Sequence, residues 1–286
     1  MVSNHKIKIS LGTVDKNTIE QWILPYLSKG KRGFGTKTPL YQIVEIILYR
    51  LKTGCQWREL PIKQFINDGN MSWQNIYYYF NKWSKDGSWR QVWIEFLKAN
   101  KTHLDLSCVQ LDGSHTPAKR GGESVGYQGR KSSKTSNSLF LVDNRGQMLA
   151  LAEPQAGQHH DLYEIKKLFL ELCDLLKAAD IPTQGLFLNA DPGFDSEELR
   201  MVCDAEEIEA NIKPNPRNKT FESTDYKYFD EELYKHRSVI EHANAWMDSY
   251  KALLVRFEKK TRNWIALHWM AFVVAFLRKI SNSQKV

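Results

Sequence analysis

The chain has 286 residues, a formal net charge of +7 at neutral pH and 42% hydrophobic residues, which allows one large domain or two modest ones with a substantial core. Its four cysteines lie far apart and include no Cys-x-x-Cys pair, which argues against a disulfide framework or a zinc module and favours a reducing compartment. The first ten residues, MVSNHKIKIS, do not resemble a signal peptide, so we expect a cytoplasmic protein.

The basic excess is concentrated in the N-terminal third. Residues 1–105 contain 16 Lys and Arg side chains against 8 Asp and Glu side chains, whereas the remainder is nearly neutral. Such a bias indicates a module that binds a polyanion, with nucleic acid as the expected partner and a merely solvated surface as the alternative.

The N-terminal third is predicted to be helical. One helix is expected from Thr38 as N-cap to Gly54 as its stop, and two more are expected to start at Ser72 and Ser88. Short helices joined by tight turns, rich in aromatic residues and positive charge, indicate a helix-turn-helix-like DNA-binding domain over residues 1–104.

From about residue 105 the pattern changes to alternating strands and helices. A strand is expected at 107–112, a hairpin at 137–154 and a helix at 161–180. These are followed by a strand at 185–191, a helix at 196–207, a short strand at 208–213 and a long helix at 230–257. This order predicts an α/β domain over residues 105–286 with a mixed sheet flanked by helices. The apolar run WIALHWMAFVVAFL has 14 residues, fewer than the roughly 20 that cross a membrane, so we expect a buried helix there and no membrane contact.

Two of the predicted strands end in an aspartate: Asp112 in QLDGSH and Asp191 in LNADPGF. Asp112 alone could simply start a turn. The carboxyl ends of neighbouring strands form the ligand crevice of an α/β sheet, however, and two carboxylates meeting there need a cation such as Mg²⁺. A third acid could come from any of four side chains, Asp161, Asp195, Glu241 or Asp248.

Helical geometry favours Glu241. At about 100° per residue, Tyr234, Arg237 and Glu241 fall within an arc of roughly 60° on the predicted long helix. The alternative is an ordinary surface pair between Arg237 and Glu241, which lie four residues apart.

Three segments carry a resemblance to a known family: LDGSHTPAKRGGESVGYQGRK, LNADPGFD and YKHRSVIEHANAW. They resemble the DDE transposases of bacterial insertion sequences, in the group of families four and five, whose Tyr-x2-Arg-x3-Glu signature is matched by Tyr234, Arg237 and Glu241. The segments ILYRLKTGCQWRELP and WQNIYYYFNKW are also similar to the helical domain ahead of the catalytic core there, so the resemblance runs from about residue 35 to 277.

The resemblance implies an RNase H-like fold and assigns Asp112, Asp191 and Glu241 as the catalytic, metal-binding triad. It implies two Mg²⁺ ions, replaceable by Mn²⁺, that support cleavage at the terminal inverted repeats of an insertion sequence and strand transfer to target DNA. The implied partner is double-stranded DNA, bound as paired ends by a homodimer, and the implied location is the bacterial cytoplasm at the nucleoid. One departure is Asp248, which stands where the group often has a lysine; Lys251 could take that role.

Basic residues should hold the DNA. The segment 119–134 carries five basic side chains against one glutamate and directly follows the Asp112 region. The predicted DNA contacts are Lys119, Arg120, Arg130, Lys131, Lys134, Tyr234, Arg237 and Lys251. A solvated loop is the alternative for segment 119–134, and the glycines there do not fit a phosphate-binding P-loop because an arginine interrupts GRKS.

The stretch GQHHDL could suggest a zinc site, but we expect Asp161 to cap the following helix instead. Two rival functions stay open from the sequence. One is an RNase H-like nuclease that uses the same triad without strand transfer, and the other is a transposase-derived DNA-binding regulator without catalysis.

Overall fold

The structure is a computed structural model that describes residues 14–30, 36–66, 71–215 and 229–283. The polar stretch at 213–230, where the sequence predicts a surface loop, falls mostly outside these ranges. Among the described residues, all four cysteines are free thiols, as the spacing predicts.

The N-terminal third is helical, as predicted. Its helices are α1 (Lys16–Trp22), α2 (Leu40–Thr53), α3 (Ile62–Phe65), α4 (Trp73–Lys85) and α5 (Ser88–Ala99), with 3-10 turns at Leu24–Tyr26, Trp57–Glu59 and Lys101–His103. Gly54 ends α2 with a left-handed φ of 67°, and its N–H donates to the Arg50 carbonyl. The start of α2 differs from the prediction, because Pro39 and not Thr38 occupies the N-cap position.

The remainder forms a mixed sheet, as predicted. Its strands are β1 (Val109–Pro117), β2 (Gly126–Gln128), β3 (Ser133–Val142), β4 (Met148–Leu151), β5 (Gln155–Ala156), β6 (Phe187–Ala190) and β7 (Glu209–Ile212). The order is β2-β3-β1-β6-β7, with β4 and β5 also paired to β3. β1 is antiparallel to β3 and parallel to β6, which is parallel to β7. The β3–β4 hairpin is the predicted one, and Asp143 stabilises its turn by accepting hydrogen bonds from the Arg145 and Gln147 N–H groups.

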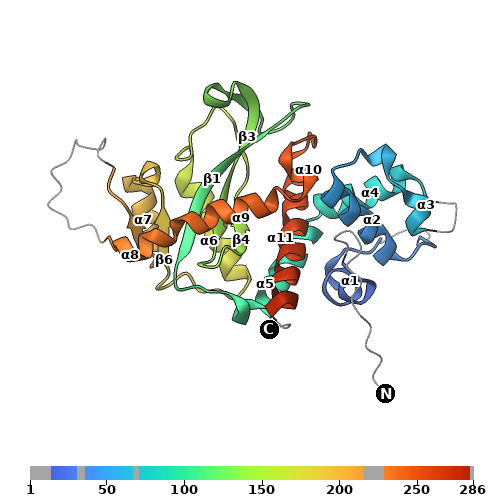
Figure 1. The fold of residues 1–286 in the computed structure, drawn as a ribbon, viewed down its shortest axis with the longest axis horizontal. Helices are drawn as coiled ribbons and strands as arrows, with labels where there is room; N and C mark the ends of the chain where they lie inside the picture. Colours follow the sequence, from blue (N-terminus) through green and yellow to red (C-terminus); the bar gives the residue numbers. More distant parts are fainter. Residues whose placement is uncertain (1–13, 31–35, 67–70, 216–228, 284–286) are drawn as a thin grey trace, which may run out of the picture.

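Helices flank this sheet. α6 (Ile165–Ala178) packs against β3 and β4, and α7 (Glu197–Ala205) packs against α6 and β7. In Figure 1, α9 (Val239–Met247) crosses in front of the sheet, where it contacts β1 and β3. This α/β arrangement, preceded by a helical region, is the predicted RNase H-like fold class, which is confirmed.

The long helix predicted at 230–257 is wrong, because the chain breaks there. It forms α8 (Glu231–Tyr234), a 3-10 turn (Lys235–Ser238), α9 and the short α10 (Lys251–Leu254). Between α9 and α10, Tyr250 has an extended backbone with φ −89° and ψ 100°. This turns its side chain into the core, where it is 2% exposed, so burial of the ring outweighs continuation of the helix.

The helical region and the sheet share one hydrophobic core. Trp93 of α5 donates its Nε1–H to the Leu149 carbonyl of β4 at 2.8 Å, and its ring lies 5.5 Å from that of Phe272. Phe272 belongs to α11 (Thr261–Ser283), which stands between the sheet and the N-terminal helices in Figure 1. α11 is long and apolar enough to cross a membrane, but most of it is buried inside the fold, as predicted for a core helix. The domain boundary between residues 104 and 105 stays a prediction.

Candidate active site

Asp112 and Asp191 lie at neighbouring positions on adjacent strands. The parallel pairing of β1 with β6 ends at Leu111 and Ala190, and each aspartate is the next residue along the chain: Asp112 is still in β1, whereas Asp191 directly follows β6. The sequence predicted that the strand ends at Asp112, and this prediction is wrong. β1 continues to Pro117 because it remains paired with β3. The two aspartates therefore lie where β6 stops while β1 continues, still paired with β3.

Arg237 links this edge of the sheet to Glu241. Its Nη1 lies 3.6 Å from Asp191 Oδ1, and its Nη2 lies 3.6 Å from Glu241 Oε1. Arg237 lies in the 3-10 turn Lys235–Ser238, and Glu241 lies one helical turn later, in α9. The two side chains are therefore on the same face, as predicted, although the predicted single helix is divided into shorter ones. Because α9 packs against β1, all three predicted acids lie around one edge of the sheet.

Asp161 is a fourth acid at this edge, and its predicted role as a helix cap is wrong. α6 begins at Ile165 after Glu164, which makes no side-chain cap bond. Asp161 instead accepts a hydrogen bond from Asn137 Nδ2 at 2.7 Å and lies against Gly113. A Cβ at Gly113 would stand 2.3 Å from Asp161 Oδ1, so the glycine beside Asp112 makes room for this carboxylate. In the sequence, Gly113 was interpreted only as part of a turn, although a glycine beside Asp112 can also indicate that another group packs closely against the strand.

The histidines beside Asp161 take part in local contacts. The ring of His159 stacks on Tyr163 with centroids 3.6 Å apart, and His160 Nδ1 accepts a hydrogen bond from the Leu162 N–H. Neither contact is one that a zinc ligand would make.

Its surroundings change the titration of Asp112. Burial, above all, and the charges of Asp161 and Asp191 raise the pKa of Asp112 to about 6, although the Gly113 N–H and Arg237 oppose the rise. Burial also raises the pKa of Tyr234, which lies close to Arg237 and Asp191. Arg237 acts on Asp112, Asp191 and Glu241, and Asp161 adds a fourth carboxylate beside Asp112, so acidic side chains outnumber this guanidinium.

This donor set fits a hard divalent cation, because all of its ligands are oxygens and the excess charge is negative. Asp191 and Glu241 are open to solvent, with side chains 49% and 63% exposed, so an ion could reach them. Within the described ranges, no three His, Cys, Asp or Glu side chains lie close enough to hold a metal ion as they stand. Arg237 occupies the position between Asp191 and Glu241 and offsets part of their charge.

Apart from Tyr234 and Arg237, which lie beside Asp191, the predicted DNA-binding residues are divided between two places. The exposed side chains of Arg130, Lys131 and Lys134 lie around β2 and the start of β3, and Lys131 Nζ donates to the His115 carbonyl at 2.9 Å. Lys251 starts α10, and its charge and that of Lys131 act on Asp248, whose pKa is raised chiefly by burial.

The other group, Lys119 and Arg120, lies near the junction with the helical region. Lys119 donates its backbone N–H to the Arg256 carbonyl, and Arg120 lines a cavity at the junction with the helical region. The basic segment 119–134 is thus not one loop over the acids, because β2 pairs with β3 in its middle.

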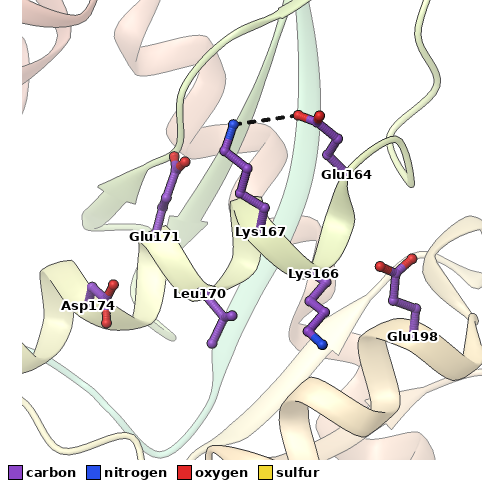
Figure 2. A pocket seen from close by; sticks show the side chains of 7 residues that line it. All are labelled: Glu164, Lys166, Lys167, Leu170, Glu171, Asp174 and Glu198. Atoms are coloured by element: carbon purple, nitrogen blue, oxygen red, sulfur yellow. Dashed lines mark ion pairs between the residues drawn. The ribbon is translucent and has the colours of Figure 1, made fainter.

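A separate depression of about 550 Å³ lies on α6 and α7, away from the predicted site residues (Figure 2). Its lining is mostly charged and exposed, with Lys167 paired to Glu164 at 3.6 Å. Exposed pairs of this kind contribute little stability, and none of the predicted site residues lines the depression.

Comparisons with known proteins show the family of the chain. The family model described as "DDE superfamily endonuclease" matches residues 111–277, more than half of the chain and all four acids. The one described as "Putative transposase of IS4/5 family" matches residues 18–93, the helical region. No curated protein matches the chain.

Among solved structures, the chain is similar to Mos1 transposase in two complexes. In the paired-end complex with the left transposon end, the identity is 11%, the TM-score is 0.29, and the alignment covers 86% of this chain and 82% of the other. In the Mos1 mariner paired-end complex with Mn, the identity is 13%, the TM-score is 0.30, and the alignment covers 91% and 87%. These likenesses are too weak to support a statement about this chain. The two family matches do support one: the chain belongs to the DDE endonuclease superfamily and is a DDE transposase of the IS4/5 type.

Proposed function

We propose that this transposase binds the terminal inverted repeats of an insertion sequence, cleaves the DNA there and transfers the strand to target DNA. The observation that supports this best is that Asp112 and Asp191 follow directly on the last paired residues of β1 and β6, with Arg237 between Asp191 and Glu241. The natural setting for such a protein is the bacterial cytoplasm at the nucleoid, where we expect a homodimer to hold a pair of double-stranded ends.

Asp112, Asp191 and Glu241 would hold two Mg²⁺ or Mn²⁺ ions. The ions would supply a lower pKa for an attacking water or 3′-hydroxyl and stabilisation of the leaving oxygen. Asp112 would supply the most buried carboxylate of the three, and the charges of Asp161 and Asp191 both act on it. Asp191 and Glu241, which are more exposed, would each complete one side.

Arg237 and Tyr234 would bind phosphate beside the cleaved bond. The guanidinium of Arg237 presents a planar fork of N–H donors, which matches two phosphate oxygens. Its contacts to Asp191 and Glu241 are long, at 3.6 Å each, so a phosphate can compete for the same donors. The exposed side chains of Lys119, Arg120, Arg130, Lys131, Lys134 and Lys251 would hold the DNA backbone farther from the cleaved bond.

An end-cleavage and joining assay tests this proposal. Labelled terminal-repeat DNA and supercoiled target DNA are incubated with the protein and Mg²⁺, and cut and joined products are separated on a gel. The proposal expects Asp191→Asn to keep DNA binding and lose both products. The control Asp174→Asn removes an exposed carboxylate from α6 and should retain full activity.

The assay also separates the rival functions. Cleavage without joined products would favour a nuclease, and binding without cleavage by the unaltered protein would favour a regulator. Undiminished cleavage by Asp191→Asn would remove this residue from the triad.

A further inference from the structure

A cavity of about 590 Å³ lies where the helical region meets the C-terminal part of the chain. Its walls come from the end of α2, the turn at Trp57–Glu59, α4, Arg120 and residues 257–263. Its volume is within the roughly 300–1,000 Å³ typical of small-ligand sites. None of Asp112, Asp191 and Glu241 lines it.

One wall of this junction cavity is aromatic and held in place. The ring of Trp57 meets Tyr77 edge-on with centroids 5.1 Å apart and lies 4.9 Å from Phe80. Its Nε1–H donates to Glu258 Oε1 at 3.2 Å, which fixes the orientation of the indole. Trp73 and Phe257 also line the cavity, and Phe257 is 50% exposed although it is a large apolar side chain. A flat ligand would therefore find rigid rings to stack on.

The rim of the cavity is positively charged. Arg58, Arg120, Lys259 and Lys260 line it with exposed side chains. The single acidic residue in the lining, Glu258, is buried and paired with Arg50 at 2.7 Å, so its charge is already neutralised. The cavity thus combines aromatic faces with four cationic groups at its mouth.

Two buried polar side chains in the lining have unused hydrogen-bonding capacity. Arg50 is 5% exposed and stacks on Trp57 at 4.5 Å, and its Nε and Nη1 have no hydrogen-bond partner among the described residues. Asn263 is 1% exposed, and its Oδ1 likewise lacks a partner there. Buried polar groups are usually hydrogen-bonded, so a bound ligand or water in the cavity would complete these two side chains.

The cavity is connected to the catalytic edge through β1. The strand runs from Asp112 to Pro117, a distance of about 17 Å at ~3.3 Å per residue, and then leads to Arg120 at the rim. The segment after β1 is docked on the rim, because the Glu123 N–H donates to the Lys259 carbonyl at 2.9 Å. A Cβ at Gly122, whose φ is +128°, would stand 2.4 Å from the same carbonyl oxygen.

We propose that the junction cavity binds one unpaired nucleotide of the DNA, with its base against the aromatic wall and its phosphate on the cationic rim. The inference rests on the proposed function in taking DNA as the partner. Paired bases are stacked inside a duplex and cannot reach such a wall, whereas an unpaired base presents its face for stacking. The cavity lies too far from Asp112 to hold the reacting phosphate, so it binds a different position of the same DNA.

Binding of a six-nucleotide thymidine oligomer, measured by fluorescence anisotropy in EDTA, tests this inference. Phe257→Ala should weaken binding about tenfold, which is within the range for removal of one base–aromatic stack. The control Tyr78→Ala removes a similarly exposed aromatic side chain from α4 and should leave binding unchanged. Phe257→Leu, which keeps an apolar side chain without a ring, should behave like Phe257→Ala.

An abasic oligomer of the same length separates stacking from charge. The unaltered protein should bind the abasic oligomer about as weakly as Phe257→Ala binds the thymidine oligomer. Phe257→Ala should bind the abasic oligomer no more weakly than the unaltered protein does. Equal binding of both oligomers to the unaltered protein would overturn the inference. So would competition by poly-glutamate at equal charge concentration, since that would identify an acidic peptide site.

Two DNA forms could supply the nucleotide, a single-stranded tail or a base turned out of a duplex. Terminal-repeat duplexes with 2-aminopurine at successive positions distinguish them, since only a base turned out of the duplex changes fluorescence at an internal position. A fluorescence change at a tail or at an internal position that disappears in Phe257→Ala supports nucleotide binding in the cavity. If no position shows a fluorescence change that depends on Phe257, the inference is contradicted. The oligomer assay needs no metal, so it is independent of the cleavage assay. A protein that cleaves DNA ends but does not bind the thymidine oligomer would contradict only this inference. A protein that binds the oligomer but does not cleave DNA ends would contradict only the proposed function.

Discussion

Replacement of Asp112 by asparagine should stabilise the metal-free protein while it abolishes cleavage. Asp112 has a pKa near 6 in the folded chain against 3.8 as its ordinary value, so its ionised form is disfavoured by folding. A rise of about 2 units corresponds to ~3 kcal/mol at neutral pH, which we reduce to about 2 kcal/mol because the side chain is not fully buried. Asparagine has nearly the same shape and cannot ionise, so it avoids this cost.

The sign of the effect follows from proton linkage. Between pH 3.8 and about 6 the folded state binds more protons at Asp112 than the unfolded state, so this residue's contribution to stability is lost as the pH rises. The advantage of Asp112→Asn should therefore be near zero below pH 4, grow through pH 6 and reach a plateau above pH 7. Urea unfolding of both proteins in EDTA at pH 4, 5.5 and 7.5 measures it.

Mg²⁺ should reverse the order of stability. A ligand that binds only the folded state adds about 2.7 kcal/mol at 100 times its Kd, and the unaltered protein should gain this while Asp112→Asn gains much less. The reasoning is refuted if Asp112→Asn is the less stable protein in EDTA at pH 7.5, or if the difference does not change with pH. Asp174→Asn, whose carboxylate is exposed, should show neither effect.

Three further predictions concern other parts of the fold. Gly113→Ala should displace Asp161 and cost about 1 kcal/mol through its lost hydrogen bond, measured by urea unfolding, and it should weaken Mn²⁺ binding, measured by calorimetry. Glu258→Ala should leave Arg50 buried and unpaired and destabilise the protein by roughly 3–5 kcal/mol, measured as a lower urea midpoint. Burial lowers the pKa of His268 to about 4, so the free energy of unfolding should fall by up to about 1.4 kcal/mol per pH unit as the pH drops from 6.5 toward 4. His268→Gln should remove this pH dependence from the free energy of unfolding, measured with urea across that range.

Each of these has a contrasting result. Gly193→Ala, where a Cβ would meet open space, should leave stability and Mn²⁺ affinity unchanged, and equal effects at Gly113 and Gly193 would contradict the close contact with Asp161. A joint replacement of Arg50 and Glu258 by methionine and leucine should recover most of the loss, and failure to do so would mean that the pair does more than neutralise itself. An identical pH profile for His268→Gln and the unaltered protein would contradict the assigned protonation of His268.

Much of the fold could be predicted because local signals and burial agree. The helix that ends at Gly54, the β3–β4 hairpin and the buried α11 each have a pattern that tertiary packing reinforces. The single helix over 230–257 failed for the opposite reason. Its residues favour a helix locally, but burial of Tyr250 requires an extended backbone at that point.

The candidate site was predicted in its members but not in its arrangement. Strand ends located Asp112 and Asp191, yet the continuation of β1 beyond Asp112 depends on pairing with β3, which no local pattern reports. Asp161 was weighed as a third acid and then given to a helix cap, because Asp before an amphipathic run usually serves there. Its position against Gly113 follows from the packing of the chain before α6 onto β1 and β3, a long-range contact that sequence periodicity does not carry.

The most direct test of the central claim is a crystal structure of the protein with terminal-repeat DNA and Mn²⁺, in which anomalous scattering locates the ions. The account predicts manganese bound by Asp112, Asp191 and Glu241, with Arg237 moved from the carboxylates to a DNA phosphate. Manganese at another place, or Arg237 still between Asp191 and Glu241 with no ion beside Asp112, would contradict it.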